Sequence, residues 1–307
     1  MDIKNIDKLK TDFKIDFIGI GSAKSGSTWL CNLLEQHPDV AIPKLKEVTY
    51  FNKCSFNGDL NKKYSLGLDY YHSLWKEHKR CGEFSPIYLF DFKAPLLIKN
   101  YNSNIKLLVI LRNPVDRAYS HFLYDQYFDQ NIEKDLSFFD AIKKYDYLIK
   151  AGLYYNQLER YLSIFPAKNI KIFVFENAIE NPTNTAKELY KFIGVNINFK
   201  PDFSAKNESK KVKFELLDWI IGLPGKFKRI LSNFCIISSS RTNPFERTRL
   251  YQTLFNFKTM IKDKNIEPLL RKELSKKEYN RCFDFFVEDI SQLEEKYNVD
   301  VSGWKRQ

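Results

Sequence analysis

A glycine-containing turn joins an apolar run to a helical pattern near the N-terminus of the chain. Residues 15–20 read IDFIGI, a short run typical of a strand that is buried on both faces. Residues 21–30 follow at once as GSAKSGSTWL, and over residues 27–37 the large apolar side chains fall on one helical face before Pro38. A strand, a tight turn and a helix start in succession leave backbone N–H groups at the positive end of the helix, where anionic oxygens bind. This part of the chain is therefore predicted to form an anion-binding strand–loop–helix unit.

Apolar runs and helical patterns alternate along the rest of the chain. Further strands are predicted at residues 80–84, 105–111 and 170–175. Helices are predicted after a cap at Asn113, over residues 152–165, over residues 181–193 before Gly194, and over one long amphipathic stretch at residues 279–297. This alternation predicts an α/β, P-loop-like three-layer fold in which a central parallel sheet is flanked by helices.

Length and composition fit one folded domain over residues 1–307. With 44% apolar residues the chain can bury a large core, and no repeat or Pro/Gly/Ser-rich linker divides it. The longest aliphatic run, residues 107–111, is far too short to span a membrane, and the N-terminus lacks the apolar stretch of a signal peptide. The 5 cysteines are scattered with no CxxC pair, which favours reduced thiols and argues against a disulfide framework or a zinc site. We therefore expect a cytoplasmic protein.

The net charge of +11 suits an anionic ligand such as a nucleotide, or an acidic acceptor. Basic clusters are interspersed with acidic residues and no DNA- or RNA-binding signature is present, so nucleic acid is not an expected partner. Residues 215–240, which include LLDWIIGLPGKFKRIL, allow two interpretations: a helix on a membrane surface, or short pieces packed against the domain. Because residues 222–225, GLPG, interrupt the pattern, packing is favoured.

The loop differs from that of a nucleotide triphosphatase in two ways. Lys24 lies in the middle of the loop, before Gly26, whereas a triphosphatase carries its lysine after the second glycine. The predicted strand at residues 105–111 is followed by Arg112, where a triphosphatase would carry a carboxylate for Mg²⁺. The nearest acid, Asp116, falls in the first turn of a helix, where acidic residues are common. We therefore predict a phosphate site neutralised by protein cations and amides, without a metal.

Two of these segments resemble the nucleotide motifs of the sulfotransferase superfamily, whose members use 3′-phosphoadenosine 5′-phosphosulfate as sulfuryl donor. GSAKSGSTWL is similar to the family's 5′-phosphosulfate loop, and LRNPVDRAYSHF, residues 111–122, resembles its 3′-phosphate site. Other stretches follow the family pattern in the same order: EQHPDVAIPKLKEVTYF, GEFSPIYL, AGLYYNQLERYLSIFP, FENAIENPTNTAKELYKFIGV and ISQLEEKYNVDVSGW. The resemblance extends from Phe17 to Trp304 and is closest to the carbohydrate-type and bacterial branch. It implies metal-independent sulfuryl transfer to a hydroxyl or amine of a glycan or small metabolite.

The resemblance also implies which residues bind the donor. In the loop these residues are Lys24, Ser25, Gly26, Ser27, Thr28 and Trp29. The implied 3′-phosphate ligands are Arg112 and Ser120, and the basic stretch SAKNESKKVK, expected to form a loop after the sheet, adds Lys210 and Lys211. Lys24 also receives a catalytic role, because it can contact the oxygen that bridges sulfur and phosphorus and stabilise charge on the leaving phosphate.

Glu47 is the general base that the resemblance implies, since this branch uses a glutamate. A helix over residues 27–37 carries the chain ~16 Å away from the loop. Residues 38–47 reach ~33 Å if extended, so the chain is long enough to bring Glu47 back beside Lys24. Glu83, at the end of a predicted strand, is a second candidate base and equally a candidate structural hydrogen-bond acceptor.

Two further residues bear on the chemistry, and two other functions compete with sulfuryl transfer. His121 adjoins Ser120 and is the base to consider after the two glutamates, and Phe84 stands where many glycan-type members carry a lysine, which favours a less anionic acceptor. A P-loop kinase-like phosphotransferase would need a carboxylate in place of Arg112. A non-catalytic nucleotide-binding module would tolerate replacement of Glu47. Residues 52–79 and 123–150, the expected acceptor-binding loops, carry no pattern that identifies the acceptor.

Overall fold

The computed structural model describes residues 13–45, 47–53, 63–75, 79–129, 131–203, 273–297 and 299–307, together with the backbone of 210–212 and 266–268. Contacts between residues divide the chain into two compact units. The larger unit consists of Met1–Phe122, Asp135–Asn207 and Glu273–Gln307, and the smaller one of Leu123–Lys134 and Glu208–Lys272. All candidate site residues except Lys210 and Lys211 belong to the larger unit. A single domain over residues 1–307 stays a prediction.

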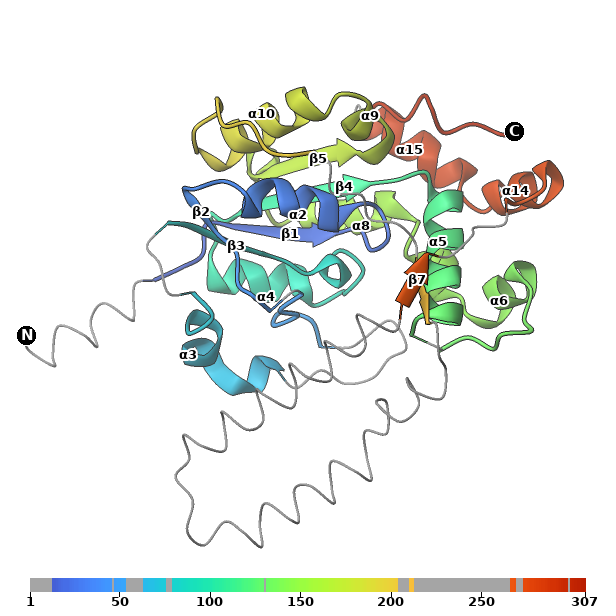
Figure 1. Cartoon of the computed structure of the whole chain (residues 1–307), viewed down its shortest axis with the longest axis horizontal. Coiled ribbons are helices and arrows are strands. Elements are labelled where there is room, and N and C mark those ends of the chain that lie inside the picture. The colour runs from blue at the N-terminus through green and yellow to red at the C-terminus, as the bar shows by residue number, and fades with distance from the viewer. Residues whose placement is uncertain are drawn as a thin grey trace, which may run out of the picture. The chain divides into compact units, whose positions relative to one another are not determined.

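Five parallel strands form the sheet of the larger unit, in the order β2-β3-β1-β4-β5 (Figure 1). The strands are β1 (Phe17–Gly21), β2 (Val40–Ala41), β3 (Arg80–Phe84), β4 (Lys106–Leu111) and β5 (Ile170–Val174). The sequence predicted all but β2, whose 2 residues are too few to leave a pattern. Helices flank this sheet, so the predicted α/β fold is confirmed.

The helices of the larger unit lie in the connections between its strands and after β5, the last of them (Figure 1). The α-helices are α2 (Ser27–Glu35), α3 (Gly67–His72), α4 (Ala94–Tyr101), α5 (Pro114–Tyr127, which continues into the smaller unit), α6 (Phe138–Lys144), α7 (Tyr147–Lys150), α8 (Tyr154–Leu162), α9 (Phe175–Glu180), α10 (Pro182–Ile193), α14 (Lys276–Phe283) and α15 (Val287–Tyr297). Short 3₁₀ helices are η1 (Lys63–Leu66), η2 (Pro86–Tyr88) and η3 (Ala167–Asn169). Gly194 ends α10 with φ of 81°, as predicted.

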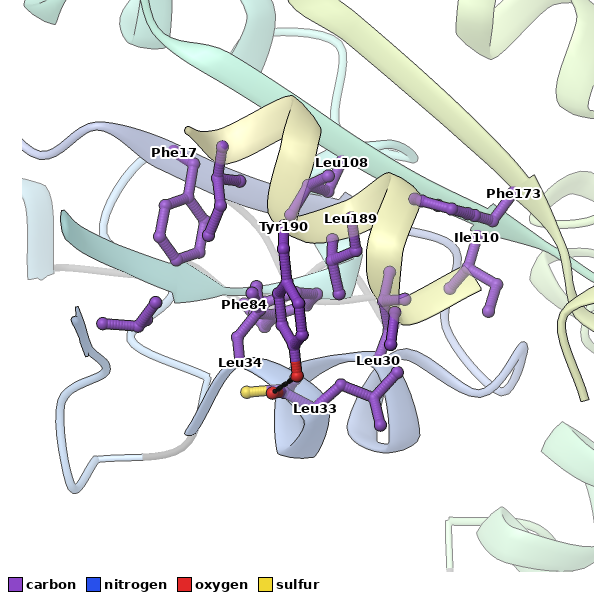
Figure 2. Packing of buried hydrophobic residues seen from close by; sticks show 14 residues of the cluster. Phe17, Leu30, Leu33, Leu34, Phe84, Leu108, Ile110, Phe173, Leu189 and Tyr190 are labelled. Atoms are coloured by element: carbon purple, nitrogen blue, oxygen red, sulfur yellow. Dashed lines mark hydrogen bonds between the residues drawn. The ribbon is translucent and has the colours of Figure 1, made fainter. Parts of the chain in front are cut away.

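Helices α2 and α10 pack together on the sheet in one hydrophobic cluster (Figure 2). The labelled members of that cluster are Phe17, Leu30, Leu33, Leu34, Phe84, Leu108, Ile110, Phe173, Leu189 and Tyr190. The Tyr190 hydroxyl also donates a hydrogen bond of 2.8 Å to the carbonyl of Leu33, which links the two helices. Each large apolar side chain that is fully buried contributes about 1.5–3 kcal/mol. The cluster therefore fixes α2 on the sheet, with its first residue near the end of β1.

The C-terminal segment forms two helices, so the prediction of one helix over residues 279–297 was wrong. Between α14 and α15 the N–H of Phe286 bonds to the carbonyl of Phe283, the tighter i to i+3 pattern of a 3₁₀ turn. The Phe286 side chain is fully buried, and a Cβ atom at Gly152 would lie 2.9 Å from its ring. Buried apolar residues lie on both sides of this break, so apolar spacing alone does not reveal it.

In the smaller unit, β6 (Lys210–Val212) pairs antiparallel with β7 (Ile266–Pro268). The backbone of Lys210 and Lys211 is therefore in a strand, and the expectation that they lie in a loop was wrong. Their side chains, and residues 215–240, lie outside the described residues. In the part of the chain that the structure describes, no helix is both long enough and apolar enough to cross a membrane.

Candidate active site

The loop at residues 22–26 directs the chain from β1 into the start of α2. Gly26 is the N-cap residue, has φ of 91°, and offers no side chain to cap the helix. A Cβ atom at Gly26 would lie 2.4 Å from the Phe175 ring, so both the backbone conformation and the packing require glycine. Lys24 also has a positive φ, 66°. A helix start with a glycine N-cap beside a lysine is an arrangement that binds anionic oxygens.

Hydrogen bonds from β4 and α8 hold the loop in place. The N–H of Ser22 donates to the carbonyl of Ile110 at 2.8 Å, and the hydroxyl oxygens of Ser22 and Ser25 are 2.5 Å apart. The Tyr154 hydroxyl donates to the carbonyl of Arg112 at 2.8 Å, and its hydrogen bonds with the two serines oppose the rise that burial causes in its pKa. The Ser25 side chain is fully buried and bonded within the loop. Its hydroxyl therefore supports the loop in this structure.

Arg112 follows β4 directly and lies beside the loop. Its Nη1 donates to the carbonyl of Lys24 at 3.4 Å, and its guanidinium lies 5.2 Å from the centroid of the Phe175 ring. Asn113 accepts two N–H bonds in the first turn of α5, so the predicted cap is confirmed. Ser120 is half-buried about 9 Å along the axis of α5 from its first residue. The structure thus brings Lys24 and Arg112 together and places Ser120 on the helix that follows Arg112.

Glu47 and the start of α2 line one small pocket. Its volume is about 20 Å³, which is room for about one water molecule. The lining residues are Ser27, Thr28, Cys31, Glu35, Ile42, Pro43, Leu45, Glu47, Phe84 and Pro86. Glu47 is exposed to solvent, whereas Phe84 is only 6% exposed and belongs to the hydrophobic cluster. The chain therefore returns to the start of α2, and Phe84 gives the pocket an apolar wall.

Glu83 is fully buried. It lies two residues before Ser85, whose hydroxyl oxygen accepts the N–H of Thr49 in the segment that carries Glu47. Its carboxylate accepts hydrogen bonds from the hydroxyls of Tyr71, Ser85 and Tyr88, at 2.7, 2.6 and 3.0 Å. Burial raises the pKa of Glu83 to about 7, against the lowering effect of these three hydrogen bonds. Of the two roles that the sequence left open for Glu83, this geometry supports the structural acceptor.

His121 is buried beside the buried guanidinium of Arg117. Nη1 of Arg117 lies 3.1 Å from Nδ1 of His121, and since a guanidinium only donates, that ring nitrogen accepts. Burial, together with Arg117 and Lys24, holds the pKa of His121 well below its usual value, so the ring is neutral at pH 7. A histidine in this environment is a weak proton acceptor.

The side chains at the start of α2 divide between pocket and core. Ser27 and Thr28 line the pocket, while Trp29 packs against the hydrophobic cluster. A contribution of Trp29 to donor binding would therefore come from its backbone. Among the described residues, no group of three or more His, Cys, Asp and Glu side chains could hold a metal ion.

Three residues near the site were not predicted. Phe175 covers Gly26, Tyr154 supports the loop, and Nζ of Lys63 bonds to the carbonyl of Val48 at 2.9 Å. The position of Phe175 directly after β5 is a usable signal, because the carboxyl ends of parallel strands meet at one edge. The sequence does not show which of the two adjacent tyrosines, Tyr154 or Tyr155, supports the loop. It also does not show which group Lys63 contacts.

The sulfotransferase domain family model matches residues 14–304. The chain belongs to the sulfotransferase domain family. The solved structure of a sulfotransferase from Alicyclobacillus acidocaldarius is similar in fold, with a TM-score of 0.62, 22% identity, and coverage of 96% of this chain and 100% of that one.

Curated sulfotransferases are also similar over part of the chain. The membrane-associated sulfotransferase kil1 of Dictyostelium discoideum is 36% identical over 107 residues, 35% of this chain and 22% of that protein. The heparan sulfate glucosamine 3-O-sulfotransferase 5 of Mus musculus is 28% identical over 191 residues, 57% of this chain and 52% of that protein. The matched region thus spans between 22% and 52% of the length of these two relatives.

Proposed function

We propose that the protein transfers a sulfuryl group from 3′-phosphoadenosine 5′-phosphosulfate to a hydroxyl or amine of a glycan or small molecule. Membership of the sulfotransferase domain family supports the reaction type. The name of one relative, a heparan sulfate glucosamine 3-O-sulfotransferase, supports a sugar acceptor. The observation that carries the proposal is the pocket in which Glu47 lies beside the start of α2.

The loop and Arg112 fit the anionic end of such a donor. The glycine N-cap of α2 leaves the helix start open to an anion, and Lys24 adds a cation. The residues that would hold the 5′-phosphosulfate are Lys24, Ser25, Gly26, Ser27, Thr28 and Trp29, with Arg112 and Ser120 as the ligands of the 3′-phosphate. Lys210 and Lys211 remain candidates for the same nucleotide.

Glu47 would act as the general base. Its exposed carboxylate would take the proton from the acceptor oxygen or nitrogen, which makes that atom a better nucleophile. When bound, the donor supplies an activated sulfuryl group on a phosphate leaving group. Lys24 would stabilise the negative charge that develops on that phosphate. The apolar wall at Phe84 favours an acceptor with an uncharged surface next to the reacting group.

The test is to incubate the protein with the sulfated donor in EDTA and to measure release of 3′-phosphoadenosine 5′-phosphate. The acceptors are a neutral disaccharide, an amino sugar, a phenol and an aliphatic alcohol, each added separately. We expect release that depends on an acceptor and persists in EDTA, because the cations at the loop are side chains of the protein. Phosphoryl transfer from ATP and Mg²⁺ with no release from the sulfated donor would instead favour a kinase-like enzyme. Tight binding of the nucleotide without release in any reaction would favour a non-catalytic module.

A further inference from the structure

We propose that Glu83 is a positioning residue that, through the hydroxyls of Ser85 and Tyr88, fixes the backbone that carries Glu47. The inference rests on the proposed function, in which Glu47 is the base. It assigns a task in the same reaction to a buried carboxylate that no acceptor can reach, since Glu83 is 0% exposed.

The two hydroxyls connect the carboxylate to three consecutive backbone amides. Ser85 donates to Glu83, and its Oγ accepts the N–H of Thr49 at 2.8 Å. Tyr88 also donates to Glu83, and its hydroxyl oxygen accepts the N–H groups of Tyr50 and Phe51 at 2.7 and 3.1 Å. When Glu83 is ionised, its carboxylate accepts a hydrogen bond from each hydroxyl, so the lone pairs of both hydroxyl oxygens are directed at the amides.

The backbone held in this way is one that would not keep its shape by itself. Glu47 and Thr49 have φ of 57° and 52°, in the left-handed region that residues other than glycine rarely adopt. Such a conformation persists where surrounding contacts enforce it. Lys63 adds further restraint, since its Nζ donates to the carbonyl of Val48 at 2.9 Å and to the hydroxyl of Thr49 at 2.7 Å.

Tyr71 gives the matched control within the same cluster. It is fully buried like Tyr88, and its hydroxyl donates to the same oxygen of Glu83 at 2.7 Å. Its hydroxyl is bonded to the carboxylate, whereas that of Tyr88 connects the carboxylate to the amides. Tyr71→Phe and Tyr88→Phe therefore remove one buried hydroxyl each, and differ in whether the backbone of residues 50 and 51 loses its acceptor.

The first experiment measures amide hydrogen exchange in wild type, Tyr88→Phe and Tyr71→Phe. We expect exchange at Tyr50 and Phe51 to rise ~10-fold or more in Tyr88→Phe, because each amide loses its acceptor, and to stay within ~3-fold of wild type in Tyr71→Phe. Ser85→Ala gives a second variant, with the rise expected at Thr49. Equal protection of residues 49–51 in all four proteins would overturn the inference.

The second experiment measures turnover with the fastest acceptor of the panel. We expect Tyr88→Phe to lower kcat ~10- to 100-fold, with unchanged affinity for 3′-phosphoadenosine 5′-phosphate, because a misplaced base costs rate and leaves the nucleotide site intact. In the background of Glu47→Gln the same change should alter kcat by less than ~3-fold, since the group it positions is already lost.

These measurements distinguish an error in the assignment of Glu47 as the base from an error in the positioning role of Glu83. If Glu47→Gln keeps full turnover, the assignment of the base is wrong, whatever Tyr88→Phe does. If Glu47→Gln loses turnover but Tyr88→Phe has an equal effect with and without Glu47, Tyr88 acts elsewhere and the inference fails while the base stands. A loss of kcat in Tyr71→Phe as large as in Tyr88→Phe would also overturn it, because it would reflect general damage to the cluster.

Discussion

The buried carboxylate of Glu83 makes the free energy of unfolding depend on pH. Its pKa is about 7 in the folded protein, against an ordinary value of 4.5. Between these values the folded protein holds a proton that the unfolded chain releases, so the contribution to stability is full below pH 4.5 and is lost as the pH rises through 7. For a fully buried group the loss is about 3 kcal/mol.

Glu83→Gln should remove that part of the pH dependence, because an amide does not titrate. Urea unfolding at intervals from pH 5 to 8 measures it. Asp289→Asn is the control: burial raises the pKa of Asp289 to about 7 as well, but its carboxylate accepts the N–H groups of Tyr154 and Tyr155, away from Glu83. Each variant should lose only the part of the pH dependence that its own carboxyl group causes. If the free energy of unfolding depends on pH in Glu83→Gln as steeply as in wild type, Glu83 is deprotonated in both the folded and the unfolded protein over this range.

Arg112 is predicted to recognise the 3′-phosphate. A hydrogen bond to a charged group contributes about 1.5–3 kcal/mol, so Arg112→Ala should weaken binding of 3′-phosphoadenosine 5′-phosphate roughly 10- to 150-fold. Binding of the 3′-dephosphorylated analogue should change much less. Calorimetry with both nucleotides measures this, and Arg80→Ala, which removes an arginine paired with Asp16, is the control. Equal losses for the two nucleotides would place Arg112 elsewhere in the site.

At the scale of elements, the loop before α2 depends on one glycine. Gly26→Ala combines an unfavourable positive φ with a Cβ atom 2.4 Å from the Phe175 ring. Gly67 is the matched control, because its φ is 80° while no described atom lies within 4 Å of a Cβ placed there. We expect Gly67→Ala to cost about 1 kcal/mol of stability, and Gly26→Ala to cost at least about 2 kcal/mol and to weaken nucleotide binding ~10-fold or more. Thermal unfolding and calorimetry measure both, and similar effects in the two variants would contradict the role of the loop.

The sequence predicts those elements whose local pattern and tertiary environment agree. The strands β1 and β4 are buried along almost their whole length, so the apolar run and the buried strand coincide. The break near Phe286 depends on packing against distant residues such as Gly152, which periodicity does not contain. The strand at Lys210 is a pairing with residues 266–268, a contact that no local pattern announces.

At the scale of the whole larger unit, the site collects at the carboxyl edge of a parallel sheet. The loop follows β1, Ser85 follows β3, Arg112 follows β4 and Phe175 follows β5. This rule makes Lys24 and Arg112 foreseeable neighbours. The contacts of Tyr88 and Lys63 with residues 48–51 are different, because they join side chains to the backbone of a distant loop. The sequence offers no register for such pairs.

The central claim is that Glu47 is the base of a sulfuryl transfer, and the kcat of Glu47→Gln beside Glu35→Gln tests it most directly. Both glutamates are exposed and line the same pocket, so the pair separates proton abstraction from a change of charge there. Release of 3′-phosphoadenosine 5′-phosphate should fall ~10²–10⁴-fold in Glu47→Gln and by less than ~3-fold in Glu35→Gln, with the same nucleotide affinity and melting temperature in both. Wild-type turnover in a folded Glu47→Gln protein would contradict the account.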